Sequence, residues 1–477
     1  MKRFYTLFSL GLSTFIFAQF TTPGNGSTYT LSSLSTAAPT VLVNNGSEYQ
    51  MTNDITIAAT DKLIIDENTT VKVDAGKALY VYGEYHTTTS NFVITATNIT
   101  APFKGIQFET GSIAEMKNTT VEFGGGIRVL TENFLMDNCI VRKNASGVAT
   151  NGAVSLFRGN PVIKNSQFLE NVKSGIGSGT SSAVSVTIEN NYFFGNNTGN
   201  NNNPQINIGM SVTDSVRVIN NTVIGNRELT KTGGISVSML LGSDSRFRIE
   251  GNTVKDNRYG INSQGAGCEG IIKNNILENN NTETNPNNGG SGIALYNVKN
   301  VIVRNNQIRN NLWGITLPAS GMADLGTEDD PGQNIFKDNA NNGNTVALFN
   351  NTDNTISAVG NCWREGELST DAMVEEVLGS KNPGTIIYKP YDCALTLAVQ
   401  DSKVQKIKLF PNPSNGNFTL ETEKSGNYII SDMSGKMLTS GIVSKGSNQI
   451  SVKLPSGNYI LVYQAEGKRI SEKILIK

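Results

Sequence analysis

The chain has 477 residues, with 39 Lys and Arg against 40 Asp and Glu, one His and four Cys. A net charge of −1 leaves no basic footprint for nucleic acid. The single histidine, His86, excludes metal sites built from clustered histidines, and any histidine-dependent nucleophilic mechanism would rest on it alone. The length allows two to four domains or one elongated one, and 60 Asn and 48 Gly dominate the composition.

Residues 1–18 have the pattern of a secretory signal peptide. Two basic residues follow Met1, an apolar stretch then ends at Ala18, and polar Gln19 comes next. A basic start, a short apolar core and a small residue before the cut are typical of such signals. A membrane anchor fits less well, because the apolar core is short and no second basic flank follows. We expect cleavage between Ala18 and Gln19, and a mature chain outside the cytosol.

The segments 19–49 and 50–95 precede any clear repeat. The second segment contains four short alternating stretches, which predict the entry strands of a solenoid. These stretches are Ile55-Thr56-Ile57, Leu63-Ile64-Ile65, Val71-Lys72-Val73 and Leu79-Tyr80-Val81. A solenoid needs a cap over its first open edge, and residues 19–49 are the expected cap.

The middle of the chain repeats with a variable period. Frames that begin at a recurring polar pair are spaced by 20 to 31 residues, which is typical of a solenoid with uneven loops. The frames begin at Asn118, Asn138, Asn165, Asn190, Asn220, Gly251, Asn274 and Asn305. The residues two before and three after each reference are apolar in all eight frames. The sixth residue after it is Asn in seven of them, from Asn144 to Asn311 and including Asn226.

Each frame predicts short strands that point one side chain inward. A third strand opens at a Gly-apolar step, as at Gly126-Ile127 and Gly260-Ile261. Three strands per turn predict an all-β, right-handed parallel β-helix. Asn suits left-handed turns and stacked side-chain ladders, so we interpret the excess Asn as architecture. Residues 50–395 resemble the pectin-lyase-like proteins with parallel β-helix repeats, a fold that hosts lyases, hydrolases, epimerases, adhesins and scaffolds.

The solenoid is expected to close near residue 395. Asn361-Cys362-Trp363 and residues 385–391 resemble the final coil of such repeat proteins, and apolar residues at helical spacing predict a short helix within 368–380. Cys362 and Cys393 flank this region. Two interpretations stay open for them, a disulfide or two separate buried thiols.

Residues 407–477 have a different texture. Asn becomes sparse, and short strands alternate with Gly turns, which predicts a small antiparallel β-sandwich. The motifs Ile407-Lys408-Leu409-Phe410-Pro411-Asn412-Pro413 and Gly457-Asn458-Tyr459, with a basic end at Lys473 and Lys477, resemble the type A C-terminal sorting domain of the type IX secretion system of Bacteroidota. The resemblance implies passage through the periplasm, recognition by the outer-membrane machinery and removal of the domain. Residues 396–406 are then a linker. An accessory carbohydrate-binding sandwich is the alternative.

Enzymes that this chain resembles place their reacting groups on the outer face of the strand that the Gly-apolar step opens. In this register the outward residues there are Gln107, Arg128, Ser155, Gly177, Asn207, Ser236, Asn262, Ala294 and Thr316. Uronate lyases of the fold need acidic Ca²⁺ ligands and a basic residue, and hydrolases need close carboxylates. This face has neither, and the sequence lacks the Gly-His-Gly and Asp-Pro-His-Glu motifs of related enzymes. We therefore predict no catalytic residue.

A basic stripe is the first candidate binding site. Arg217 and Arg248 share an outward column in neighbouring coils, with Lys273 and Arg304 one position over. Such a stripe would hold uronates or sulfates. Gln107 and Arg128, in the outward column of the Gly-apolar strand, are further candidate ligand-binding residues. The alternative is a solvated surface whose charge is balanced by two acids, Glu189 and Glu250.

Two further candidates are an acidic insertion and an aromatic group. Asp324, Glu328, Asp329 and Asp330 lie close together in one turn and predict a Ca²⁺ site, with an ordinary polar loop as the alternative. The aromatic group offers platforms for sugars and consists of Tyr80, Tyr82, Tyr85 and His86.

These observations predict a secreted or cell-surface β-helix protein. Its expected role is non-catalytic glycan or surface binding, or that of an adhesin-like scaffold. The alternative is a polysaccharide lyase or glycoside hydrolase that acts on uronate-containing polysaccharides. The expected partners are the type IX machinery and a polysaccharide, without nucleic acid, without a membrane span in the mature chain and without a cofactor unless the acidic loop binds Ca²⁺.

Overall fold

The computed structural model describes residues 19–209, 211, 214–367, 369–380, 384–391, 393, 407–432, 437–465 and 468–477. The predicted signal peptide 1–18 and the predicted linker 396–406 lie outside these ranges. The chain divides into two compact units, Met1–Thr396 and Leu397–Lys477, and each is described by itself.

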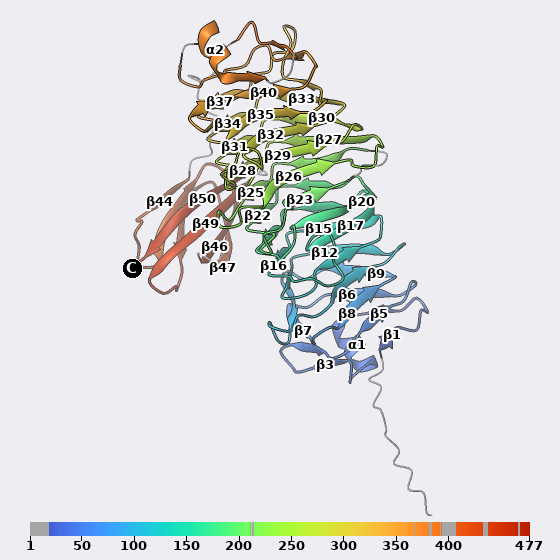
Figure 1. Ribbon diagram of the computed structural model, residues 1–477. Helices are drawn as coiled ribbons and strands as arrows, with labels where there is room; N and C mark the ends of the chain where they lie inside the picture. The colour runs from blue at the N-terminus through green and yellow to red at the C-terminus, as the bar shows by residue number, and fades with distance from the viewer. Residues whose placement is uncertain are drawn as a thin grey trace, which may run out of the picture. The chain divides into compact units, whose positions relative to one another are not determined.

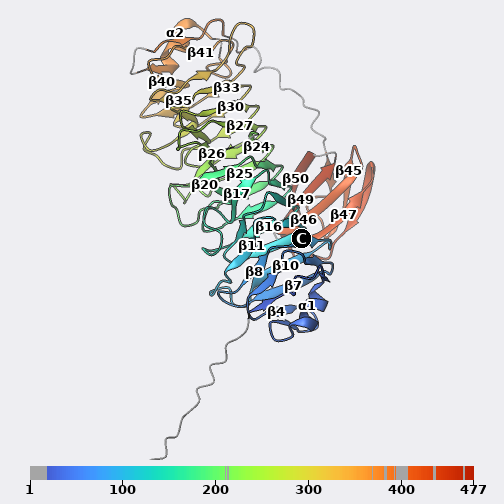
Figure 2. The same cartoon turned by 90° about the vertical axis from the view of Figure 1, so that its right-hand side faces the viewer.

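The first unit is a parallel β-helix in which each coil adds one strand to each of three long sheets (Figures 1 and 2). Sheet A is a 14-stranded sheet of β1 (Phe20–Thr21), β5 (Ile55–Ile57), β8 (Ala78–Val81), β11 (Gly105–Phe108), β14 (Ile127–Val129), β17 (Val154–Gly159), β20 (Ile176–Val184), β23 (Pro204–Ile208), β26 (Gly233–Ser238), β29 (Ile261–Gln264), β32 (Ser291–Tyr296), β35 (Trp313–Pro318), β40 (Leu348–Asn351) and β42 (Leu378–Ser380).

The next strand of each coil joins sheet B. Sheet B is a 14-stranded sheet of β2 (Thr28–Tyr29), β6 (Lys62–Ile65), β9 (Glu84–Thr87), β12 (Ile113–Lys117), β15 (Asn133–Asp137), β18 (Val162–Lys164), β21 (Thr187–Glu189), β24 (Val216–Ile219), β27 (Ser245–Glu250), β30 (Cys268–Lys273), β33 (Asn300–Arg304), β36 (Ala323–Asp324), β41 (Ile356–Ser357) and β43 (Ile386–Ile387).

The third strand of each coil joins sheet C. Sheet C is a 13-stranded sheet of β3 (Leu42–Asn44), β4 (Tyr49–Met51), β7 (Thr69–Val73), β10 (Phe92–Ala96), β13 (Thr119–Glu122), β16 (Ile140–Arg142), β19 (Gln167–Leu169), β22 (Tyr192–Phe194), β25 (Thr222–Ile224), β28 (Thr253–Lys255), β31 (Ile276–Glu278), β34 (Gln307–Arg309) and β37 (Ile335–Lys337). A small hairpin, β38 (Ala340–Asn341) with β39 (Asn344–Thr345), lies outside the three sheets.

The two apolar columns predicted from the repeat form the core. All sixteen side chains, from Met116 and Val121 in the first frame to Val303 and Ile308 in the last, are 0% exposed. The predicted turns are confirmed as well. The eight reference residues all have left-handed backbone, with φ between 48° at Asn118 and 69° at Gly251. Asn tolerates this region better than other residues with a side chain, which explains its use at this corner.

Two ladders of buried amides run up the inside corners of the coils. In the first ladder, each Asn side chain donates from Nδ2 to Oδ1 of the next, as from Asn252 to Asn275 and from Asn275 to Asn306, at 3.0 and 2.9 Å. In the second ladder, the prediction was wrong at Asn226. This residue turns outward, and Gln205 takes its place between Asn196 and Asn257. The longer Gln205 side chain reaches both Asn196 and Asn257 at the position in the ladder that Asn226 does not occupy.

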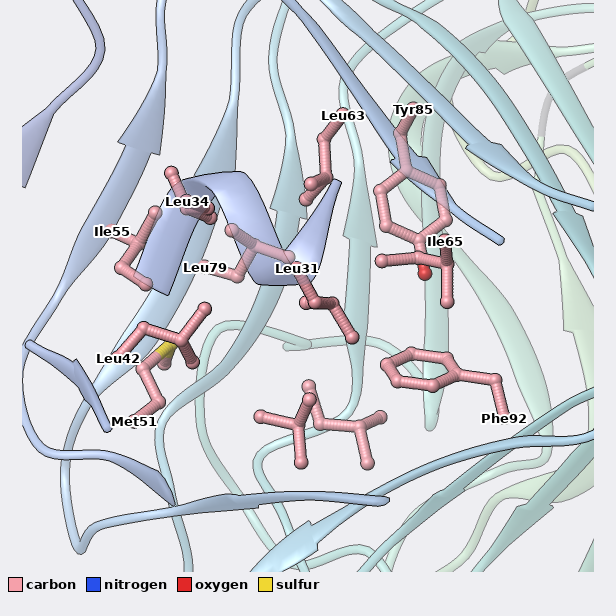
Figure 3. A pocket seen from close by; sticks show the side chains of 12 residues that line it. Leu31, Leu34, Leu42, Met51, Ile55, Leu63, Ile65, Leu79, Tyr85 and Phe92 are labelled. Atoms are coloured by element: carbon pink, nitrogen blue, oxygen red, sulfur yellow. The ribbon is translucent and has the colours of Figure 1, made fainter. Parts of the chain in front are cut away.

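The first edge of the helix is closed by α1 (Leu31–Ala37). Figure 3 shows Leu31 and Leu34 facing the apolar side chains of the first coils, around a void of about 20 Å³. Its apolar walls offer a water no partner. Residues 20–29, within the segment predicted as a cap, already pair with β5 and β6 as strands β1 and β2.

Asp61 fastens this first segment. Its buried carboxylate accepts hydrogen bonds from the backbone N–H of Gly24, Gly26 and Ser27 at 2.8 to 3.0 Å. Burial by itself would raise the pKa of Asp61, but these bonds and one from Thr22 hold it below its usual range.

The other edge is closed by α2 (Asp371–Val377), as predicted. Its buried Met373, Val374 and Val377 face the last coils. The structure joins Cys362 to Cys393 by a disulfide, which is one of the two alternatives for this pair.

The second unit consists of two antiparallel sheets. One contains β44 (Lys408–Phe410), β45 (Asn417–Thr422) and β48 (Gly446–Ser451). The other contains β46 (Gly426–Asp432), β47 (Met437–Val443), β49 (Gly457–Ala465) and β50 (Lys468–Ile476). Phe418, Leu461 and Tyr463 lie in a small core of their own, as the sandwich prediction requires.

Candidate functional site

The outer face of sheet A carries the residues predicted to face outward. Strand pairing places all nine, from Gln107 to Thr316, in one continuous column in the predicted order. The column continues to Tyr80 on one side and to Phe349 on the other. Arg128 and Arg158 are the only charged residues in the strands of this sheet. The face is therefore nearly neutral along its length.

A groove of about 420 Å³ opens in the middle of this face. Its floor is formed by Asn207, Ser236 and Asn262 of the column, together with Ser238 and Gln264 two residues further along their strands. The volume lies within the range of small-molecule and cofactor sites. Amide and hydroxyl groups from successive coils thus meet in one concave surface.

Tyr259 and Arg258 line one wall of the groove. The Tyr259 ring lies against Gly233, where a Cβ atom would come within 2.1 Å of the ring. The Arg258 guanidinium lies 5.9 Å from the ring centroid. Its Nε donates to the Asn288 carbonyl at 2.8 Å, and its two terminal nitrogens donate to the Asn202 side chain and to the same carbonyl. Arg258 therefore ties two loops together beside the tyrosine.

The floor is partly pre-organised by its own hydrogen bonds. Asn262 Nδ2 donates to Ser236 Oγ at 3.1 Å, and the hydroxyls of Ser236 and Ser238 lie 3.0 Å apart. Within the described residues, the side-chain amides of Asn207 and Gln264 make no hydrogen bond to the protein. These two amides and the Oδ1 atom of Asn262 therefore point donors and acceptors at whatever fills the groove.

Gln107 and Arg128, the two binding residues predicted on this sheet, lie outside the groove. Gln107 Nε2 donates to Glu109 Oε1 at 2.5 Å. The Arg128 guanidinium stacks 4.3 Å from the centroid of the Phe157 ring, and its buried Nε has no hydrogen-bond partner among the described residues. Ser155, next in the column, is fully buried. This part of the face is packed more tightly than the groove.

The predicted basic stripe lies on sheet B and is neutralised by acids. Arg217 and Arg248 are paired in register, as predicted. Lys273 and Arg304 are paired with each other two residues further along, which is the next position on the same side of the strands, also as predicted. Arg248 and Lys273 share Glu250, at 2.6 and 3.4 Å. Arg217 pairs with Asp214 at 2.9 Å, not with Glu189 as the sequence suggested, because the loop before β24 brings Asp214 beside it.

Arg304 and the acidic insertion, predicted as separate sites, contact each other. The Arg304 side chain is only 7% exposed and lies 2.8 Å from Asp324 and 2.9 Å from Asp330. It is thus turned into the insertion rather than toward solvent. In the part of the chain that the structure describes, no group of three His, Cys, Asp or Glu is arranged to hold a metal ion. Calcium binding by Asp324, Glu328, Asp329 and Asp330 stays a prediction, with Arg304 occupying two of the four carboxylates.

The predicted aromatic group is split by the strand alternation. Tyr85 points into the core and is 1% exposed, so its assignment as a sugar platform was wrong. Tyr80 faces outward from sheet A, and Tyr82, which directly follows strand β8, is exposed. His86 faces outward from sheet B between Glu84 and Glu115, at 2.9 and 3.4 Å. Burial raises the pKa of the Tyr85 hydroxyl, and its hydrogen bond with Thr87 offsets part of that rise.

Comparison with known families agrees with this architecture. Residues 41–207 and 77–240 match the family described as a right-handed β-helix region, and residues 408–477 match the secretion system C-terminal sorting domain. The chain is a right-handed parallel β-helix protein with a type IX sorting domain. Residues 289–366 of this β-helix protein also match a family of proteins of unknown function, DUF1565.

The sorting domain fixes where the β-helix protein works. It directs export through the periplasm by the type IX secretion system, so the protein is secreted or displayed on the outer surface. No helix in the described part of the chain is long and apolar enough to cross a membrane.

Other comparisons add little about function. No curated protein matches the chain. A solved structure from Geobacillus virus E2, ORF18, aligns with 9% identity and a TM-score of 0.21, over 92% of this chain and 71% of that one. A similarity at this level supports no inference about this protein.

Sequence reasoning missed part of the groove. Ser238 and Gln264 lie two residues after Ser236 and Asn262, so strand alternation was a signal that could have found them. Arg258 and Tyr259 come just before the Gly-apolar step at Gly260, and no periodic pattern marks them. Their position depends on contacts with loops of other coils.

Proposed function

We propose that this protein is an exported β-helix scaffold that binds a polysaccharide in the sheet A groove without cleaving it. The observation that carries the proposal is the set of hydrogen-bonding side chains at Asn207, Ser236 and Asn262, repeated on three successive coils. Sugar hydroxyls both donate and accept hydrogen bonds, and amides and hydroxyls match both roles.

The described strands of sheet A lack a pair of carboxyl groups, and this supports binding over cleavage. Retaining and inverting glycosidases use two carboxyl groups at about 5 to 9.5 Å from each other across the bond. The described strands of sheet A contribute no carboxylate. A lyase would need a base and groups that neutralise a uronate, and Arg128 is stacked on Phe157 instead.

Polysaccharide cleavage remains the second candidate, and one cluster favours it. Glu109 accepts a hydrogen bond from Gln107 and, by its charge and a hydrogen bond, raises the pKa of Tyr82. Arg128 is the neighbour of Gln107 in the column. A carboxylate, a tyrosine and an arginine on one outward face are groups that proton transfer uses.

A retention and turnover assay separates the two candidates. The purified protein would be incubated with acidic and neutral polysaccharides, while retention, reducing ends and unsaturated products are followed. Binding requires retention without new ends. Turnover that is lost in Arg128→Gln, Arg217→Gln or Arg248→Gln would overturn the binding proposal.

We also propose that residues 1–18 are removed on export from a cell of the Bacteroidota. The support is the basic and apolar pattern that ends at Ala18, together with the sorting domain. N-terminal sequencing of the exported protein should start at Gln19. A start at Met1 would contradict the proposal.

A further inference from the structure

We propose that the sheet A groove selects an uncharged polysaccharide, whose successive sugar residues lie against Asn207, Ser236 and Asn262. This inference rests on the proposed function and adds the class of ligand. It differs from the uronate-containing ligand that the resemblance and the basic stripe suggested.

The groove carries little charge. The groove is lined by amides, hydroxyls and a few apolar groups, with Arg258 as the one charged residue among them. Three of the five N–H donors of Arg258 are already bonded to the Asn202 side chain and the Asn288 carbonyl. A uronate in each successive sugar residue would lose hydration with only this one cation to compensate it, and an uncompensated buried charge is costly. The cations of the predicted stripe lie on sheet B and are paired with acids.

The polar groups of the groove recur at a regular spacing. Strand pairing puts Asn207 opposite Ser236 and Ser236 opposite Asn262, so these groups recur at about 4.8 Å along the axis. That repeat is close to the length of one pyranose residue. An extended peptide advances about 3.3 Å per residue and falls out of step with it. A linear polysaccharide along the axis would keep the same contacts from coil to coil.

One wall of the groove is a fixed, uncharged aromatic ring. The Tyr259 ring is held between Gly233 and Arg258 and offers a rigid surface for the apolar face of a sugar. Its hydroxyl stays protonated over the ordinary pH range, because burial raises the pKa of Tyr259 to about 12. The groove thus combines fixed neutral hydrogen-bonding groups with one aromatic wall.

Affinity electrophoresis of the purified full chain tests this proposal. The gels would contain mannan or β-glucan as neutral probes, polygalacturonate or alginate as acidic probes, and gelatin as a polypeptide probe. We expect retardation by a neutral probe that persists at about 0.5 M salt, where exposed charge interactions are screened. Asn262→Leu and Gln264→Leu should each weaken it by about tenfold or more, a change equivalent to about 1.4 kcal/mol.

The matched control is Gln167→Leu, which removes an outward half-buried amide from sheet C. It should bind as the original protein does. Should Asn262→Leu fail to fold in a thermal melt, Asn207→Ser carries the same test with a small polar side chain.

The outcomes distinguish a failure of the uncharged ligand class from a failure of the proposed polysaccharide binding. Salt-sensitive retardation by acidic probes alone would overturn the neutral class and keep the proposed function. Neutral binding that survives the groove substitutions would overturn the site. Retardation by gelatin alone, or by no probe, would overturn both.

Discussion

The outer faces of sheets A and B are built from the same coils but use their polar groups differently. On sheet B, arginines and lysines meet acids, as Arg246 and Lys299 meet Glu269 at 2.8 and 3.2 Å. On sheet A, none of the ion pairs found within the described residues involves a strand residue, and amides stay unpaired in a groove. On sheet B the charged groups pair with one another, whereas on sheet A some side-chain amides keep donors and acceptors that no group of the described residues uses. The face with the most charged residues is therefore not the face with the most unpaired hydrogen-bonding groups.

The largest expected effect is a loss of stability caused by a substitution on sheet B, with no change in binding at sheet A. Arg304→Leu removes a nearly buried cation and leaves Asp324 and Asp330 without their partner. We expect a loss of about 3 kcal/mol in the free energy of unfolding, at the low end for a broken buried pair because both acids keep some solvent. Urea unfolding would measure it. Polysaccharide binding by the folded variant should be unchanged, and a loss of binding would break the comparison.

A smaller effect is expected from Gly233→Ala on sheet A. The new Cβ would collide with the Tyr259 ring at 2.1 Å and push it out of the groove wall. Binding to a neutral probe should fall by about tenfold, or about 1.4 kcal/mol, as measured by affinity electrophoresis. Gly457→Ala is the control, since its nearest neighbour would lie 3.6 Å from the added atom. Equal effects of the two substitutions would argue against a role for Tyr259.

The two faces should also respond differently to pH. Hydrogen bonds from Lys62 and Arg246 hold the pKa values of Glu84 and Glu269 below their usual range. Their stabilising contribution is complete above the unfolded pKa of about 4.3 and is lost as the pH falls through the lower folded pKa. Thermal melts should therefore show an acid-sensitive limb, which Glu269→Gln makes shallower.

The affinity of the sheet A groove should not fall at acidic pH together with the stability, as long as the protein stays folded. The pKa of Tyr259 is raised to about 12 by burial, so the groove keeps its protonation state from about pH 5 to about pH 10. Affinity measured across that range should be constant. A titration of binding with a midpoint near a carboxyl pKa would place the ligand on the charged face instead.

The smallest effect is expected for Arg248→Gln. Arg248 is largely exposed, and Glu250 keeps Lys273 as a second partner at 3.4 Å. The free energy of unfolding should change by less than about 1 kcal/mol, as for other surface ion pairs, and neutral binding should not change. Urea unfolding and affinity electrophoresis on one preparation would measure both. A large loss of binding would restore the basic stripe as the site.

The sequence by itself determined the coil and its register. The Asn at each reference position predicted a left-handed turn, and the apolar residues on either side predicted the two buried columns. The outward column from Gln107 to Thr316 followed from the same register. These features are local and repeat in every coil, so the same residue type at the same position in several repeats supports one register.

Only the tertiary structure decided which side chains meet across coils. Gln205 replaces Asn226 in the ladder, Asp214 captures Arg217, and Arg258 reaches the loop of Asn288. Each of these contacts depends on the lengths and paths of loops, whose variation makes the repeat spacing range from 20 to 31 residues. Periodicity specifies the coil, and irregular loops specify the site.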